Sequence, residues 1–393
     1  MLVNTVLGID TLPVQITARR APGGPGVCIS GLSDAAAREV KVRVECALRA
    51  VGLAVPSVDV GVAPEGGHAI FPDAAFDLPI ALEVLRAAGT LTFADRVTAY
   101  GELSLHGRIR PVRGISCRLE GDCGTRAVIP ADNAAEAAWF VKPGDEPVAC
   151  GSLTDAVAWL HGERGCVVER RLVEPKEPAP VDAAVAKHEA FALLVNATIT
   201  TGIGRALLVA PPGVGSTVLA RSLVDMLPAL TPEQACEVTR IYSVAGLTCP
   251  DGPITRRPFR APHHTVSVLG LTGGGDRPRP GEVSLAHRGV LMLDDVTEFG
   301  ERQLRCLVQD LNACESYPQH EIYGLARFPA YPAAVVATAR PCQCGYYGST
   351  RRACHCTPAA LERYQQRLQR IQELLEATRV AMRDAPRLVS ATA

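Results

Sequence analysis

The sequence predicts an α/β protein in which an α+β domain precedes a core built on a parallel β-sheet. Three observations support this prediction. Helical patterns and an alternating strand pattern are mixed before residue 167, as in α+β domains. A charged, proline-rich stretch follows, which is typical of a linker. Beyond it, short continuous apolar runs alternate with helical patterns, as they do where parallel strands are buried on both faces.

A chain of 393 residues is too long for one typical hydrophobic core, so several domains are expected. The changes in pattern and composition place the boundaries between them. We predict residues 1–167 as the first domain, 168–186 as the linker, 187–340 as the core, 341–357 as a cysteine-rich module and 358–393 as a C-terminal helix.

Two stretches of the first domain have the apolar spacing of amphipathic helices. The stretch 33–52 opens with Ser33 and Asp34, which are favourable N-cap residues. Its apolar positions fall on one helical face: Ala36, Val40, Val44, Ala47 and Leu48. The stretch 76–89 ends in glycine, as many helices do. Between the two, residues 57–64 alternate as a half-buried strand does.

In the core, three apolar runs are candidates for neighbouring strands: 206–210, 289–293 and 333–339. Near the end of the chain, residues 358–385 have a strongly helical pattern. Its seam positions are spaced alternately by three and four residues: Leu361, Tyr364, Leu368, Ile371, Leu375, Thr378 and Met382. This seam fits either a helix packed on its own domain or a helix that associates with a partner.

The composition excludes some classes of protein. The net charge is −1, so no overall charge attracts the chain to nucleic acid or to a membrane surface. No apolar stretch reaches the roughly 18 residues that a membrane-spanning helix needs. The first residues lack the basic and then apolar order of a signal peptide. We therefore expect a cytoplasmic protein with no membrane partner.

The segment "APPGVGST" (210–217) lies between a predicted strand and a helical pattern. Strand, glycine loop and helix is the arrangement of a phosphate-binding loop, in which backbone N–H groups surround phosphates at the start of the helix. The Thr217 hydroxyl is suited to hold Mg²⁺ there. The candidate nucleotide-binding residues are Pro212, Gly213, Val214, Gly215, Ser216 and Thr217.

This loop departs from the pattern G-x-x-x-x-G-K-[ST], because Ala210 replaces the first glycine and Ser216 replaces the lysine. A serine hydroxyl brings no positive charge to the β- and γ-phosphates. A hydrogen bond to a charged group contributes about 1.5–3 kcal/mol, so we expect affinity to fall about ten- to a hundredfold. Hydrolysis loses more, because one missing donor lowers a rate by about 10²–10³. The alternative is an inherited strand–turn–helix that binds no nucleotide.

Four of the 14 cysteines are clustered in "CQCGYYGSTRRACHC". They are Cys342, Cys344, Cys354 and Cys356. Two C-x-C pairs separated by nine residues can converge on one tetrahedral Zn²⁺, which accepts four thiolates. The alternative is four reduced thiols in a loop.

The C-terminal region is rich in arginine. From Arg340 onward there are nine arginines, no lysine and four acidic residues. This balance suits contact with the phosphate backbone of DNA. A solvated helix face explains the same charges.

Five motifs spread over residues 1–365 are long enough to indicate a family. They are "ISGLSDAAAREVKVRVECAL", "FDLPIAL", "GELSLHGRIRPVRG", "LPALTPEQACEVTRIYSVAGL" and "RPFRAPHHTVSVLGLTGGGDRPRPGEVSLAHRGVLMLDD". Together they closely resemble the Mg-chelatase-like AAA+ family of the ComM/YifB type. The resemblance implies a Lon-protease-like N-terminal domain followed by an AAA+ P-loop core that binds ATP and Mg²⁺. Ala75 and Ser116 stand at the Lon nucleophile and base positions, so we expect no peptidase activity.

The resemblance also assigns roles at two strand ends. Asp294 would hold Mg²⁺ through water, and Asp295 stands where the family has a glutamate that polarises the attacking water. Asp295 is one methylene shorter, so we expect impaired catalysis. Arg340 occupies the family's polar "sensor" position, which is normally asparagine, and it would contact phosphate or project to solvent. The family stretch that supplies an arginine to a neighbouring subunit has no clear counterpart here.

These departures favour a family member with an eroded ATP site. We interpret the chain as a weak nucleotide binder without efficient hydrolysis, with a regulatory or partner-binding role. It would associate with itself, with an intact AAA+ relative or, through the Arg-rich C-terminal region, with DNA. The alternative interpretation is an active ATP-dependent DNA branch-migration motor. The expected ligands are ATP with Mg²⁺, bound weakly or not at all, and a structural Zn²⁺.

Overall fold

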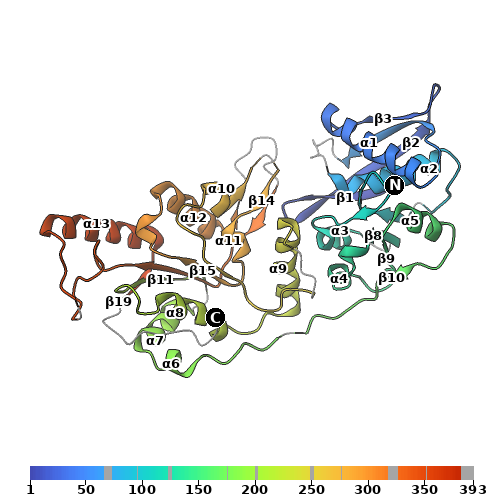
Figure 1. Cartoon of the computed structure of the whole chain (residues 1–393). Coiled ribbons are helices and arrows are strands. Elements are labelled where there is room, and N and C mark those ends of the chain that lie inside the picture. Colours follow the sequence, from blue (N-terminus) through green and yellow to red (C-terminus); the bar gives the residue numbers. More distant parts are fainter. Residues whose placement is uncertain are drawn as a thin grey trace. The chain divides into compact units, whose positions relative to one another are not determined.

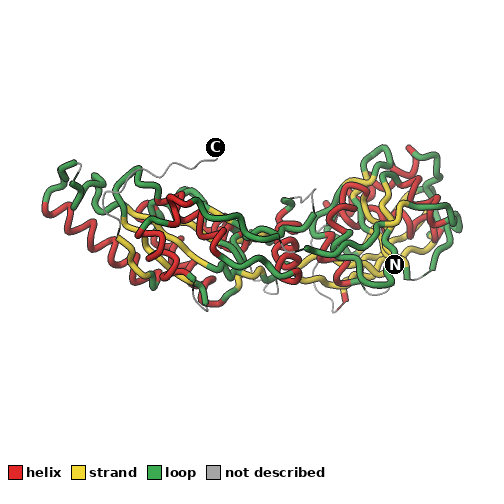
Figure 2. Tube along the Cα trace, turned by 90° about the horizontal axis from the view of Figure 1, so that it is seen from below, coloured by secondary structure: helices red, strands yellow, loops and turns green. Residues whose placement is uncertain are grey.

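The computed structural model describes residues 1–65, 73–94, 96–122, 126–174, 176–199, 202–247, 252–275, 277–316, 326–350 and 352–381. They form two compact units, Met1–Val173 with Tyr242–Pro253, and Glu174–Ile241 with Ile254–Ala393. Both units mix helices with strands, as the colouring of Figure 2 shows. The segment Tyr242–Pro253 lies inside the predicted core range yet groups with the first unit.

The first unit contains two four-stranded sheets, in the orders β1-β2-β4-β3 and β10-β9-β8-β5, and a small β6-β7 pair. The strands are β1 (Leu2–Leu7), β2 (Asp10–Arg20), β3 (Gly26–Ser30), β4 (Ser57–Pro64), β5 (Val97–Ala99), β6 (Glu102–Leu103), β7 (Ile109–Arg110), β8 (Arg126–Pro130), β9 (Val148–Cys150) and β10 (Cys166–Val167). The helices are α1 (Asp34–Ala50), α2 (Asp77–Ala87), α3 (Ile115–Gly121), α4 (Ala134–Ala137) and α5 (Leu153–Leu160).

The elements predicted for this unit are confirmed. Helix α1 is capped by Ser33, whose side chain accepts a hydrogen bond from the backbone N–H of Ala36. Its buried residues are the five predicted ones: Ala36, Val40, Val44, Ala47 and Leu48. Helix α2 lies within the predicted stretch 76–89 and strand β4 occupies 57–64. Helix α2 buries even Asp77, whose carboxylate is paired with Arg43 at 2.6 Å.

The second unit is built on a five-stranded sheet in the order β12-β15-β18-β11-β19, in which every pairing is parallel. These strands are β11 (Gly204–Val209), β12 (Phe259–Arg260), β15 (Val290–Leu293), β18 (Ala334–Ala339) and β19 (Thr378–Ala381). The three predicted apolar runs are β11, β15 and β18, so the predicted parallel sheet is confirmed. Two short pairs lie outside it: β13 (Gly273–Gly274) with β14 (Arg279–Pro280), and β16 (Glu315–Ser316) with β17 (Phe328–Pro329).

Helices cover both faces of this sheet (Figure 1). They are α6 (Ala183–Ala186), α7 (Glu189–Thr198), α8 (Ser216–Met226), α10 (Val268–Thr272), α11 (Glu282–Leu285), α12 (Glu301–Ala313) and α13 (Pro358–Leu375). Helix α9 (Pro232–Ala245) ends within the segment that groups with the first unit. Helices α7 and α8 pack with one set of strand side chains, and α10, α12 and α13 pack with the alternate set. This two-sided burial explains why the strands are continuously apolar. No helix among the described residues is long and apolar enough to cross a membrane.

The predicted C-terminal helix is wrong for residues 376–381. Glu376 adopts a left-handed conformation (φ 52°) and ends α13, and Thr378 then opens β19, which pairs with β11. Val380 is the buried residue of β19, and it packs in the same core cluster as Ala206 and Leu208 of β11. Backbone pairing with β11 and burial of Val380 therefore outweigh the helical spacing of the sequence. Met382 lies outside the described residues.

The helical part of this prediction has a definite packing partner. Leu368, Ile371 and Leu375 are buried in the same core cluster as β11, β15 and β18. Of the two interpretations of the seam, a helix packed on its own domain is confirmed. The opposite face of α13 is exposed and lies outside that core.

Candidate nucleotide site and metal centre

Three strand ends meet at one edge of the parallel sheet. Strand β18 lies between β11 and β15, with Val209 level with Ala339 and Leu293 level with Ala337. The N–H of Ala210 continues this ladder by donating to the carbonyl of Ala339 at 3.0 Å. The phosphate loop, the acidic pair and the sensor position therefore all follow carboxyl ends of adjacent strands. That edge is where open α/β sheets bind ligands.

The phosphate loop retains the backbone geometry that the sequence suggests. Gly213 and Gly215 have left-handed backbones, with φ of 79° and 92°. Helix α8 begins directly after them at Ser216, which is half-buried, and Thr217 is exposed. The first N–H groups of such a helix lack intrahelical acceptors and favour an anion. The backbone can therefore surround a phosphate, but the Ser216 side chain supplies no charge.

The two acidic residues after β15 are connected through Thr338. Its hydroxyl donates to Oδ1 of Asp294 at 2.7 Å and accepts from the backbone N–H of Asp295 at 2.9 Å. Asp294 is exposed, as a carboxylate that holds hydrated Mg²⁺ has to be. The sequence prediction missed Thr338. Thr338 is the single polar residue in the apolar run 333–339, and that position could have indicated a role for its hydroxyl at the end of the strand.

Arg340 is paired with Asp295, the second acidic residue after β15. Its Nη2 atom lies 2.6 Å from Oδ2 of Asp295 and 3.9 Å from Oε1 of Glu298. Burial acts to lower the pKa of Arg340, but these two carboxylates raise that pKa above its ordinary value. Oδ1 of Asp295 accepts a hydrogen bond from Thr297 at 3.0 Å. Both oxygens of Asp295 thus have protein partners.

The segment that carries Arg340 is held from α13. The Tyr364 hydroxyl donates to the carbonyl of Arg340 at 3.0 Å, and the Gln365 side chain donates to the carbonyl of Pro341 at 2.6 Å. Tyr364 is one of the seam positions of the helical pattern. Its ring packs against the core, and its hydroxyl in addition holds the Arg340 backbone. The sequence prediction missed both contacts because they depend on how α13 packs.

The four clustered cysteines converge in space. The sulfur of Cys342 lies 3.3 Å from that of Cys344 and 3.7 Å from that of Cys354, and all four sulfurs, including that of Cys356, lie within 4.8 Å of one another. Tetrahedral Zn–S bonds of about 2.3 Å place sulfurs about 3.8 Å apart, so the cluster fits Zn²⁺. The backbone N–H of His355, together with other hydrogen-bond partners, lowers the pKa of Cys344 to about 6. In the same cluster a backbone hydrogen bond from Cys356 acts to lower the pKa of Cys354, but burial and the neighbouring sulfurs outweigh it and raise that pKa to about 12.

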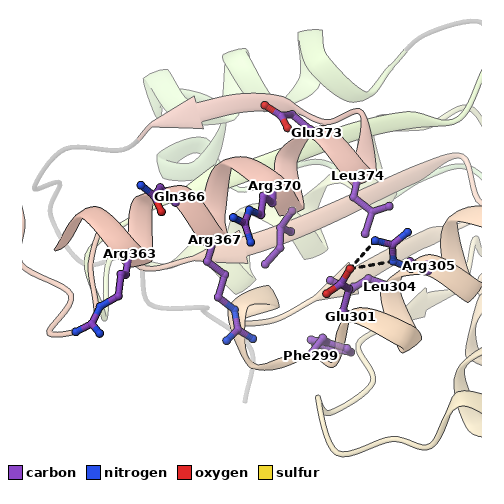
Figure 3. Close-up of a pocket in the computed structure, with 11 residues that line it drawn as sticks. Phe299, Glu301, Leu304, Arg305, Arg363, Gln366, Arg367, Arg370, Glu373 and Leu374 are labelled. Atoms are coloured by element: carbon purple, nitrogen blue, oxygen red, sulfur yellow. Dashed lines mark hydrogen bonds and ion pairs between the residues drawn. The ribbon is translucent and has the colours of Figure 1, made fainter. Parts of the chain in front are cut away.

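Helices α12 and α13 border a hollow of about 710 Å³ lined by arginines (Figure 3). We call it the arginine groove, defined by Arg305, Arg363, Arg367 and Arg370. Figure 3 shows the three arginines of α13 projecting from successive turns, while Arg305 is paired with Glu301 on α12. Arg363 and Arg367 make no hydrogen bond or ion pair within the parts of the chain that the structure describes.

The sequence matches two family descriptions. Residues 184–382 match "Magnesium chelatase, subunit ChlI", and residues 16–133 match "Subunit ChlI of Mg-chelatase". Solved structures of NtrX from Brucella abortus give a TM-score of only 0.31 at 14% identity, covering 53% of this chain and 39% of that chain. This likeness is too low to support an argument.

Curated relatives cover most of the chain. An uncharacterised protein of Mycobacterium tuberculosis, Rv2897c, is 35% identical over 366 residues, which is 91% of this chain and 72% of that protein. YifB of Salmonella typhimurium is 33% identical over 93% of this chain and 72% of its own length. The competence protein ComM of Haemophilus influenzae is 32% identical over 92% and 72%. The chain therefore belongs to the Mg-chelatase-like AAA+ family that includes YifB and ComM.

Proposed function

We propose that the chain is a family member that binds ATP with Mg²⁺ weakly and hydrolyses it slowly, and that it acts by association with a partner. The observation that carries this proposal is the ion pair between Arg340 and Asp295. A carboxylate paired with a guanidinium is held in one orientation, so it is less free to turn toward an attacking water. Here Thr297 and Arg340 hold one oxygen each.

Binding is supported by a different part of the site. The left-handed Gly213 and Gly215 present the first N–H groups of α8, and this backbone contribution does not depend on a lysine. The exposed Thr217 and Asp294 are suited to Mg²⁺. Binding therefore depends mainly on the loop backbone and the Mg²⁺ ligands, whereas hydrolysis depends on Asp295 and its partner Arg340. The residues that differ from the family are expected to lower the rate of hydrolysis more than the affinity for ATP.

The test is a titration of the purified chain with a fluorescent ATP analogue in Mg²⁺, beside single-turnover ATP hydrolysis by the same protein. Saturable binding with little phosphate release supports the proposal. Rapid hydrolysis would favour the active motor instead. No binding at millimolar analogue would mean that the second unit serves as a scaffold only.

We further propose that the four cysteines hold a structural Zn²⁺. The spacing of their sulfurs supports this assignment. Cys354→Ser is expected to abolish stoichiometric zinc and to lower the melting temperature, since a structural zinc site contributes directly to folding. Metal analysis and calorimetry measure both effects. Cys306→Ser, at a half-buried lone cysteine on α12, is the matched control. Equal zinc in both variants would contradict the assignment.

A nucleic-acid partner is the second candidate, and the arginine groove favours it. Arg363, Arg367 and Arg370 lie at positions i, i+4 and i+7, so they span about 10 Å along α13. Their side chains are exposed and line the groove together. A row of guanidinium groups of this kind suits a phosphate backbone. A DNA-directed motor activity remains the alternative function, and it would need this contact together with ATP turnover.

Arg367→Ala is expected to weaken DNA binding. The slope of log affinity against log salt concentration is also expected to become less steep. The change is about 0.7–0.9 for each phosphate that is no longer neutralised. The measurement is fluorescence anisotropy with labelled single- and double-stranded DNA at several salt concentrations. Arg302→Ala is the control, because Arg302 is exposed on α12 but does not line the groove. An identical salt slope in the native protein and both variants would exclude the groove as the DNA site.

Association with another AAA+ subunit is the remaining proposal. A chain that lacks efficient hydrolysis can still act by mixing with an intact relative. Light scattering of the chain alone, and after mixing with an intact family member, distinguishes a self-assembling protein from one that joins a mixed assembly.

A further inference from the structure

The turn that carries two of the cysteines lies close to the phosphate loop. Gly345 has a left-handed backbone (φ +88°), and a Cβ atom placed there would lie 2.9 Å from Cδ of Pro212 and 3.5 Å from Cδ of Arg340. Cβ atoms in folded proteins essentially never lie under 3.0 Å from a non-bonded atom, so a side chain at Gly345 would press on the Pro212 ring. Pro212 immediately precedes Gly213, the first left-handed glycine of the loop.

Gly345 belongs to the same tight turn as two of the cysteines. Its backbone N–H donates to the carbonyl of Cys342 at 2.9 Å, and the turn so closed contains Cys344. The sulfur of Cys342 also accepts the backbone N–H of Tyr347 at 3.3 Å. Any ion held by these two sulfurs therefore fixes the position of Gly345.

The other two sulfurs anchor this turn to the body of the unit. Cys354 and Cys356 lie just before α13, which is capped by Thr357 through the N–H of Ala360. Helix α13 is itself packed in the core through its buried apolar residues. A metal ion would join the turn to a helix that the core holds in place. Without the ion, the described contacts between them are those among the sulfurs and the two hydrogen bonds from Tyr364 and Gln365 to the carbonyls just before Cys342.

We propose that a metal ion in the Cys342–Cys344–Cys354–Cys356 cluster positions the phosphate loop, with Gly345 transmitting its effect to Pro212. This inference rests on the proposed zinc site and on the proposed nucleotide site, and it makes Gly345 a positioning residue for nucleotide binding. The two sites are then linked thermodynamically. Metal loading strengthens nucleotide binding, and nucleotide strengthens metal retention by the same factor, about 5- to 150-fold for typical linked sites.

The test compares the full chain with zinc bound and after removal of zinc by a chelator, with metal content measured in parallel. Hydrogen exchange is the readout. Pro211 and Pro212 carry no amide hydrogen, so the amides of 213–217 report on the loop. Removal of zinc is expected to speed exchange of these amides and to leave those of β1 and β2, in the first unit, unchanged. A second readout is the rate of zinc loss to the chelator, which ATP with Mg²⁺ is expected to slow.

Gly345→Ala changes the contact with Pro212, and a control at a second left-handed glycine accounts for the strain that any alanine in such a backbone brings. Gly345→Ala keeps all four cysteines, so it is expected to retain zinc and yet show the faster loop exchange of the metal-free protein. Gly348→Ala is the matched control. Gly348 has a similar left-handed backbone (φ +76°), but no atom lies within 4 Å of the position that a Cβ would occupy there. Gly348→Ala is expected to behave as the native chain.

Two results would overturn the proposal: loop exchange that is insensitive to zinc removal, or equal effects of Gly345→Ala and Gly348→Ala. A purified chain that holds no zinc would overturn it together with the zinc assignment. A chain that holds zinc and protects its loop, but binds no ATP analogue, would support the metal-to-loop link and contradict only the proposed nucleotide function.

Discussion

Ser216→Lys is expected to tighten binding of ATP with Mg²⁺ about ten- to a hundredfold, which corresponds to one hydrogen bond to a charged group. Ser216 is the first residue of α8 and follows Gly215, whose left-handed backbone starts the helix. A lysine at this position in a phosphate loop reaches the β- and γ-phosphates. The surrounding backbone already has the required turn, so the substitution adds charge without requiring a new loop conformation.

The measurement is a titration of native and variant chains with the same fluorescent ATP analogue. Ser222→Lys is the matched control, because Ser222 is also half-buried and lies on α8, nearly two turns further along. It adds the same charge to the same helix away from the loop. Equal tightening by both substitutions would mean that general electrostatic attraction, and no phosphate loop, explains the effect. No tightening by either would contradict a nucleotide site at this position.

The features that the sequence predicted well are local in the chain. The strands β11, β15 and β18 are visible as short apolar runs, and α1 shows its buried face through helical spacing. The cysteine cluster was visible because its spacing alone restricts how four sulfurs can meet. Each of these features depends on residues that are close in sequence.

The features that the sequence did not predict depend on register and packing. The pairing of Arg340 with Asp295 exists because β15 and β18 are adjacent and in a particular register. The proximity of Gly345 to Pro212 depends on the path of a turn. Strand β19 was predicted as helix because its four residues are too few to distinguish the two periods.

In a chain that already carries Ser216→Lys, the combination of Arg340→Asn with Asp295→Glu is expected to raise the rate of ATP hydrolysis. Arg340→Asn without Asp295→Glu is not expected to raise it. Arg340 holds Oδ2 of Asp295 at 2.6 Å, so a longer carboxylate alone would remain paired. Asparagine removes that pairing, and it is the residue that the family resemblance implies at this position. Since one properly placed group changes a rate by about 10²–10³, the triple variant is expected to exceed Ser216→Lys alone by roughly a hundredfold.

Single-turnover phosphate release from four proteins measures this effect: Ser216→Lys alone, with each second substitution, and with both. Because Arg340 and Asp295 are in contact, their substitutions are expected to be non-additive, with the double change exceeding the product of the single ones. Arg379→Asn in the Ser216→Lys background is the control, since Arg379 is exposed on β19 of the same sheet. Strictly multiplicative gains would show that the ion pair does not restrain Asp295. The absence of any gain would place the block to hydrolysis outside this pair.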